Sequence, residues 1–274
     1  AGTPKRSAGS WLASKKERAT MRKVDLYTHC GSNRVRREQM RDSITPPASD
    51  SHVPIPHTML WDKALSAFED SGYKLEHEAH ALNRDGQQYF GLMQLGAKGG
   101  DGASLIGNGH DASLIAGIRN SHDKRFPAAL VLGSQVFVCD NLAFSGEVKV
   151  ATRHTRYILD RLDRVVGDAV GKLANHRIKL SERHELYKSS ELSHGEVNDL
   201  VIEAMDRNVL PPTKIPQVMS EWREPRHPEF KVGGQTGWRL YNAFTESLKG
   251  SSLNLLSSRT QRLHGILDKH LTAA

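Results

Sequence analysis

The chain has 274 residues, two cysteines and a formal net charge of +7. A chain of this length can bury a core without disulfides, and Cys30 and Cys139 lack any paired spacing, so the sequence favours a reducing cytoplasm over secretion. No apolar run approaches the roughly 20 residues that a membrane-spanning helix needs. We therefore expect a soluble protein that has no membrane partner.

Positive charge is concentrated near the N-terminus. From residue 1 to residue 50, eleven basic residues accompany five acidic ones and supply +6 of the net +7. This density is typical of a tail that binds phosphates, because contact with a polyanion releases condensed counterions; the alternative is a solvated leader that keeps the protein soluble. We expect residues 1–52 to form a basic, partly disordered arm, and its expected nucleic-acid contacts are Lys15, Lys16, Arg36 and Arg37.

The folded body is expected to begin near Val53. Apolar residues at helical spacing predict a helix that Thr58 caps and Gly72 ends. The spacing of apolar residues then ceases to be helical. A β-hairpin is predicted around the turn Asn83–Gly86, because Asp-Gly is a frequent hairpin turn. Two further strands are predicted over Ser113–Asn120 and Ala128–Cys139.

Beyond Arg153 the pattern becomes helical. A long amphipathic helix is predicted from Ile158 to Leu173, with apolar residues on one face and alternating charges on the other. Start signals predict four more helices: Ser193 with Glu196 as a capping box before Val197–Met205, Pro216 before Trp222, Trp238–Leu248, and Ser258–Leu271.

These elements predict an α+β fold. A small antiparallel sheet would pack against the long amphipathic helix, followed by a helical C-terminal half. We divide the chain into the arm, an α+β core over residues 53–190, and a helical region over residues 191–274 packed on that core.

Polar residues gather where the predicted strands end. The densest cluster follows Gly117, and its Asn, Ser, His and Asp side chains could position a phosphate or a base; the alternative is a polar turn, since these residues bond their own backbone. A second cluster, Arg153–Arg156, lies at the expected start of the long helix, where unpaired N–H groups favour an anion. The candidate nucleic-acid contacts here are Arg119, Asn120, His122, Lys124, Arg125, Asn141, Arg153, His154 and Arg156.

No pattern in the sequence spells out a catalytic reaction. The fourteen histidines include His77 and His80, three residues apart on a predicted strand edge, and this spacing suits a metal only on a helix. His52 and His57 flank a Pro-rich turn and are interpreted as loop histidines. The glycines from Gly96 to Gly109 lack the ending of a phosphate-binding loop. We predict no metal, no cofactor and no catalytic residue.

Several blocks, in this order, resemble a phage and plasmid family catalogued as domain of unknown function 932. The blocks are Val53–His57, Gly117–Asp123, Val136–Asn141, Arg153–Thr155 and Trp238–Glu246. The resemblance covers roughly His52 to Leu271, and Asp140 departs from the family pattern. It implies a setting in DNA metabolism, within a bacterial or phage-infected cell. The order of elements is also similar to that of the Red-beta and Erf group of phage single-strand annealing proteins.

Together these features predict a nucleic-acid-binding protein that acts on single-stranded DNA in recombination or replication, without catalysis and as a homo-oligomer. One alternative is a metal-dependent nuclease or hydrolase that uses His122, Asp123, Asp140 and His154. Another is a protein-binding module whose basic arm engages an acidic host factor.

Overall fold

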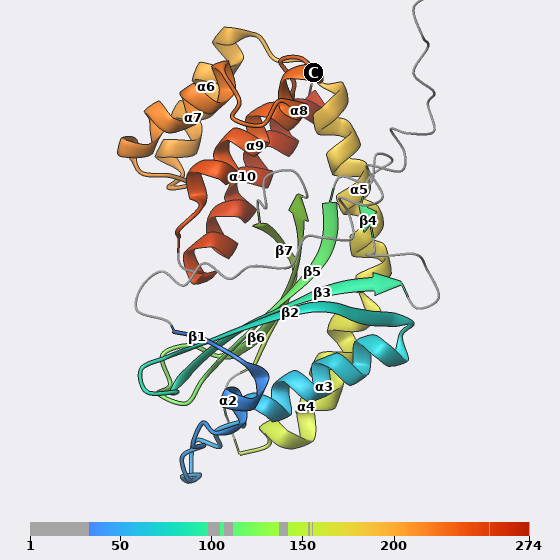
Figure 1. Cartoon of the computed structure of the whole chain (residues 1–274), viewed down its shortest axis with the longest axis vertical. Helices are drawn as coiled ribbons and strands as arrows, with labels where there is room; N and C mark the ends of the chain where they lie inside the picture. Colours follow the sequence, from blue (N-terminus) through green and yellow to red (C-terminus); the bar gives the residue numbers. More distant parts are fainter. Residues whose placement is uncertain are drawn as a thin grey trace, which may run out of the picture.

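An antiparallel sheet forms the centre of the molecule (Figure 1). The computed structural model describes residues 33–97, 105–106, 112–136, 142–152, 154, 156–251 and 253–273. Within them the strands are β1 (Asn33–Val35), β2 (Tyr73–Asn83), β3 (Gln88–Ala97), β4 (Leu105–Ile106), β5 (Ala112–Ser121), β6 (Ala128–Val136) and β7 (Leu142–Thr152). The sheet order is β1-β2-β3-β5-β6-β7, and β4 pairs with β5 outside this path. The predicted α+β class is confirmed.

The predicted hairpin is confirmed as β2 and β3. Both strands are longer than predicted and pair from Tyr73↔Ala97 to Asn83↔Gln88. Their turn contains Arg84 at φ 51°, Asp85 at φ 53° and Gly86 at φ 81°. Three left-handed residues in succession match the right-handed twist of the flanking strands, which is why the Asp-Gly pair marked this turn in the sequence.

Strand β5 lies between β3 and β6, and nearly all of its side chains are buried. It corresponds to the predicted strand Ser113–Asn120, and β6 corresponds to the first part of the predicted Ala128–Cys139. Strand β7 was not predicted. Its middle carries Ser145, Gly146 and Glu147, a composition typical of a turn, and the register with β6 shifts at this point, between Val131↔Lys149 and Gly133↔Phe144.

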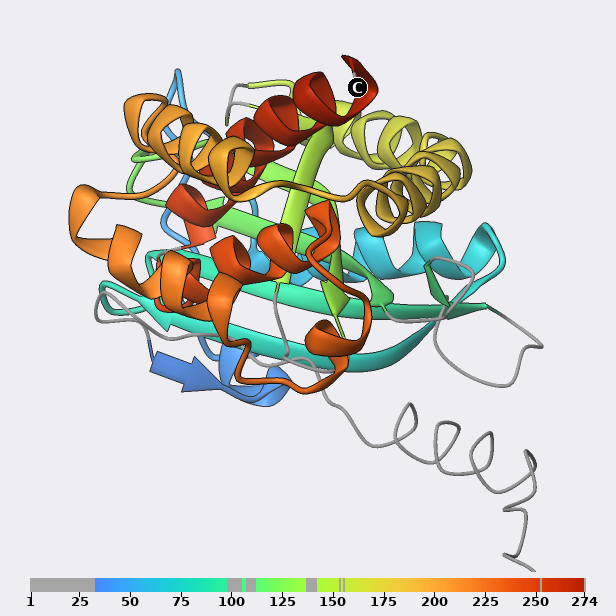
Figure 2. The same ribbon diagram turned by 90° about the horizontal axis from the view of Figure 1, so that it is seen from above.

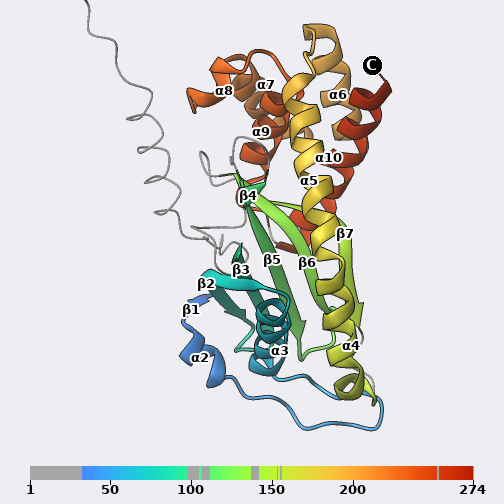
Figure 3. The ribbon, with the colours of Figure 1, turned by 90° about the vertical axis from the view of Figure 1, so that its right-hand side faces the viewer.

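Four helices pack on the sheet or beside it: α3 (His57–Asp70), α4 (Ile158–Gly171), α5 (Leu173–Ser189) and α10 (Leu253–Ala273). Helix α3 contacts β2 and β5, whereas α4 and α10 contact β7. Helices α3 and α4 also pack against each other and lie on the same side of β2 and β3 (Figure 2). In Figure 3, α4 and α5 follow one another along the side of the sheet. Among the described residues, no helix is long and apolar enough to cross a membrane.

A second group of helices gathers at one end of the molecule (Figure 1). They are α6 (His194–Asp206), the 3₁₀ turn η1 (Pro212–Lys214), α7 (Ile215–Arg223), α8 (Glu229–Val232) and α9 (Gly237–Leu248). The predicted capping box is confirmed, since Ser193 Oγ accepts from the Glu196 N–H at 3.3 Å and the Glu196 carboxylate accepts from the Ser193 N–H at 2.8 Å. Every residue of α9 is buried, and the buried apolar residues of both halves form one core cluster.

The N-terminal segment differs from its prediction. Residues from Asn33 onward, which we predicted to belong to the flexible arm, form β1 and the short helix α2 (Arg37–Arg41) on the edge of the sheet. Arg37 Nη2 lies 2.7 Å from an Asp62 oxygen, and its Nη1 lies 3.9 Å from a Glu78 oxygen. This guanidinium therefore pairs with the folded body, whereas Arg36 is exposed.

Candidate functional site

The backbone of Ile55, just before α3, is held by three side chains from distant parts of the chain. Its carbonyl oxygen accepts from Asn120 Nδ2 at 2.7 Å and from His122 Nε2 at 2.8 Å. Its N–H donates to His154 Nδ1 at 3.3 Å. Asn120 and His122 lie at the end of β5, and His154 follows β7. One residue thus ties the start of α3 to both strand ends.

The same network fixes the protonation of His57. Asn120 Nδ2 donates to His57 Nδ1 at 2.9 Å, and His57 Nε2 donates to the Gly86 carbonyl oxygen at 2.8 Å. An amide nitrogen can only donate and a carbonyl can only accept, so the His57 proton sits on Nε2. By the same reasoning His122, which donates to Ile55 through Nε2, has its lone pair on Nδ1.

Ring stacking extends this network into the core. The rings of His57 and His122 are parallel within 4°, with centroids 4.0 Å apart. On its other side His57 stacks on Tyr89 at 5.2 Å, and the Tyr89 hydroxyl hydrogen-bonds His80 Nδ1 at 2.8 Å. The ring of His52 lies 5.1 Å from that of His154. We call His52, His57, Asn120, His122 and His154 the histidine network.

Burial keeps the imidazoles of the histidine network neutral. It lowers the pKa of His57 to about 3 and that of His154 to about 4, and it also lowers the pKa values of His52 and His122. Bases this weak are poor proton acceptors near neutral pH. Their hydrogen bonds to backbone groups instead fix the position of α3 against β5 and the end of β7.

These positions correct the sequence predictions for four residues. Asn120, His122 and His154 were expected to contact nucleic acid, but each is at least 94% buried and bonds Ile55. His57 was interpreted as a loop histidine, but it is the first residue of α3 and only 1% exposed. The three bonding side chains are 65, 67 and 99 residues from Ile55. Local sequence carries no signal for such contacts.

The other predicted contacts fall into three groups. Lys124, Arg125 and Arg156 are exposed, although Arg125 Nε lies 3.5 Å from an Asp123 oxygen. Arg119 is partly buried, and its guanidinium carbon lies 5.3 Å from the centre of the Phe126 ring. The rest, Lys15, Lys16, Asn141 and Arg153, lie outside the described residues.

The described structure contains three of the four residues of the nuclease alternative, His122, Asp123 and His154. His122 and His154 are engaged with Ile55. Asp123 accepts from Gln88 Nε2 at 2.7 Å and from the Ser121 hydroxyl, and these bonds lower its pKa despite partial burial. Asp140 lies outside the described residues. In the described part of the chain, no three or more His, Cys, Asp or Glu side chains are arranged to hold a metal ion.

The histidine network brings two exposed basic segments to the same end of the molecule. Lys124 lies close enough to His52 to help lower the pKa of its imidazole, after the larger effect of burial. His52 packs on His154, two residues before Arg156. In Figure 3 the chain between α2 and α3 runs along this end to the start of α4 and back.

Helix α4 continues this basic surface with Arg161 and Arg164, both exposed. We call Lys124, Arg156, Arg161 and Arg164 the basic end. Among the described residues, no ion pair involves any of the four, whereas the neighbouring acid Asp163 pairs with Lys63. The basic end is therefore a group of four exposed cations without an ion pair among the described residues.

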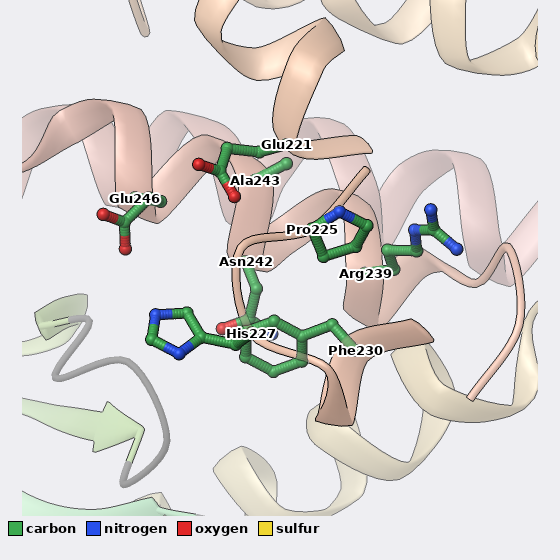
Figure 4. Close-up of a pocket in the computed structure, with 8 residues that line it drawn as sticks. All are labelled: Glu221, Pro225, His227, Phe230, Arg239, Asn242, Ala243 and Glu246. Carbon is green, nitrogen blue, oxygen red and sulfur yellow. The ribbon is translucent and has the colours of Figure 1, made fainter. Parts of the chain in front are cut away.

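A small pocket lies in the helical region (Figure 4). Its lining comprises Glu221, Pro225, His227, Phe230, Arg239, Asn242, Ala243 and Glu246. The charges around it pair internally. Arg226 lies 3.0 Å from Glu221 and 3.1 Å from Glu246, and Arg239 donates to the Arg223 carbonyl oxygen at 2.8 Å and lies over the Trp222 ring. This arrangement stabilises the packing of α7 against α9.

Comparison with known families identifies the chain. A family model described as Domain of unknown function (DUF932) matches residues 49–265. The chain belongs to this family. No curated protein and no solved structure was found to match it.

Several of the blocks that resemble DUF932 proteins contact one another in the structure. Val53–His57 and Gly117–Asp123 meet in the histidine network, and His154 of the block Arg153–Thr155 joins them. Trp238–Glu246 is the greater part of the buried helix α9. These blocks of the DUF932 protein therefore supply packing and internal hydrogen bonds, and the exposed cations beside them are the candidate contacts for a partner.

Proposed function

We propose that this DUF932 protein binds nucleic acid through its basic end, with single-stranded DNA as the expected form. The observation that carries the proposal is the cluster of four exposed cations, Lys124, Arg156, Arg161 and Arg164, which have no ion pair among the described residues. Lys and Arg side chains bind phosphate oxygens and release condensed counterions, so such a cluster favours a polyanion.

Helix geometry supports phosphate binding at this surface. Arg161 and Arg164 are three residues apart on α4 and so lie on the same face of the helix. The N-cap residue Tyr157 makes no side-chain capping bond. The partial positive charge at the start of α4 therefore adds to the field of Arg156 and attracts an anion.

The composition of the N-terminal segment provides further candidate phosphate contacts. Lys15 and Lys16 belong to the stretch that carries most of the net charge of the chain, and a second basic segment would add phosphate contacts. We place this activity in the cytoplasm of a bacterial or phage-infected cell, during recombination or replication, in keeping with the phage and plasmid family that the sequence resembles.

The test is fluorescence anisotropy of labelled single-stranded DNA, duplex DNA and RNA titrated with the full chain across a salt series. We expect binding that weakens as salt rises and that is tightest for single-stranded DNA. Parallel samples with a divalent metal would reveal cleavage if the nuclease alternative holds. Absence of binding to every nucleic acid at low salt contradicts the proposal and favours an acidic protein partner.

A further inference from the structure

Tyr157 is a large aromatic side chain left on the surface of the basic end. It is 56% exposed and is the one aromatic residue among the exposed large apolar side chains of the described chain. By contrast, Trp61, Trp222, Tyr89 and Tyr187 are fully buried. The ring of Tyr157 makes no stacking or cation-π contact with any described residue.

The position of Tyr157 within the basic end is defined by the backbone of α4. It follows Arg156 directly, and its carbonyl oxygen accepts from the Arg161 N–H at 3.3 Å. Residues four apart lie one above the other on a helix face, so Arg161 stands one turn beyond the Tyr157 ring and Arg164 stands on the next turn. Tyr157 thus stands between Arg156, which precedes it in the chain, and Arg161, one turn further along.

An exposed aromatic ring between cations can contact bases as well as phosphates. This favours a nucleic acid whose bases are unpaired. In proteins that bind single strands, basic side chains follow the backbone while aromatic side chains stack on successive bases. Bases in a duplex are already stacked on their neighbours and paired, so their faces are not free. We propose that Tyr157 stacks on an unpaired base while Arg156, Arg161 and Arg164 bind the adjoining phosphates.

This inference rests on the proposed function and adds to it the residue that distinguishes single strands from duplexes. Phosphate contacts alone would bind either form, because both expose a phosphate backbone. The preference for single strands is therefore assigned to the ring of Tyr157, and the overall affinity is assigned to the cations.

The experiment compares wild type, Tyr157→Ala and Tyr157→Phe, with Ile202→Ala as the matched control because Ile202 is 50% exposed on α6. Each full-length protein is titrated into labelled oligothymidine of about 16 nucleotides, into a strand of equal length whose residues are abasic, and into a duplex. The abasic strand keeps the phosphates and removes the bases.

We expect Tyr157→Ala to weaken oligothymidine binding by at least about fivefold, the effect of losing one base–aromatic contact, and to leave abasic-strand and duplex binding unchanged. Tyr157→Phe and Ile202→Ala should bind like wild type. The inference is overturned if Tyr157→Ala binds oligothymidine as tightly as wild type, or if wild type binds the abasic strand equally well. Wild type that binds none of the three probes overturns the proposed function itself.

Discussion

At the scale of single residues, Asn120 links the start of α3 to the sheet through hydrogen bonds. Its buried amide nitrogen donates both to Ile55 and to His57. Asn120→Ala removes both bonds inside the core, so we expect the free energy of unfolding to fall by about 1–3 kcal/mol, measured by urea denaturation. Asn175→Ala, on the exposed surface of α5, is the control and should change it by less than about 0.5 kcal/mol. Equal effects of the two variants would contradict this role.

The neutral imidazoles predict a loss of stability in acid. Burial holds the pKa of His57 at about 3 and that of His154 at about 4, against 6.5 in the unfolded chain. Above 6.5 neither state binds these protons. As the pH falls below 6.5 the unfolded state takes them up first, so the free energy of unfolding decreases until the folded pKa values are reached.

Each such histidine contributes a slope of up to about 1.4 kcal/mol per pH unit. We therefore expect urea unfolding to give a steadily lower free energy between about pH 6 and about pH 4. His154→Gln removes one of the titrating groups, so unfolding should take up about one proton fewer. The free energy of unfolding should then depend less steeply on pH. A free energy that stays constant over this interval would show that the imidazoles are not held neutral by the fold.

The histidine network also marks the limit of sequence reasoning about residues. The polar clusters around Asn120 and His154 were found because such residues often occur where strands end. Their burial was missed, because the residue that they bond, Ile55, lies 65 to 99 positions away along the chain. The exposed positions of Lys124 and Arg156 were predicted, since charged side chains rarely lose their hydration.

At the scale of elements, Gly91 shows how tightly α3 packs on β3. A Cβ at this position would lie 2.9 Å from Cζ3 of Trp61 and would also collide with the Tyr89 hydroxyl. Gly91→Ala should therefore lower the free energy of unfolding by about 1–3 kcal/mol or more. Gly265→Ala is the matched control, because nothing lies within 4 Å of that site on α10. Thermal unfolding should show a lower midpoint for Gly91→Ala and an equal or higher midpoint for Gly265→Ala.

Helix starts were predicted well where the signal is local. The Ser193 and Glu196 box involves four consecutive residues, so the sequence alone contains both partners. Helix α5 was not predicted as a separate element, because two positions on its buried face are histidines. Leu173, His176, Leu180, His184 and Tyr187 follow helical spacing and are all buried, but His176 and His184 interrupt the apolar pattern by which such a face is recognised.

At the scale of the whole molecule, the sequence could not show that two basic segments share one end. Lys124 follows β5 and Arg156 precedes α4, and each was predicted separately as a contact. Pairing of β6 with β7 and stacking of His52 on His154 bring them together. The two ends of the fold therefore differ in charge pairing. The basic end carries exposed cations, whereas the helical end pairs its charges internally around Glu221 and Glu246.

The decisive measurement is the salt dependence of single-stranded DNA binding by a variant with Lys124, Arg156, Arg161 and Arg164 all changed to Ala. The control is Arg223→Ala with Lys269→Ala, two exposed cations of the helical region. Each phosphate contact contributes about 0.7 to the slope of log affinity against log salt for a single strand. We expect the fourfold variant to bind more weakly and to lose roughly two to three units of slope, while the control keeps the wild-type slope. Unchanged affinity and slope in the fourfold variant would show that nucleic acid does not bind at the basic end.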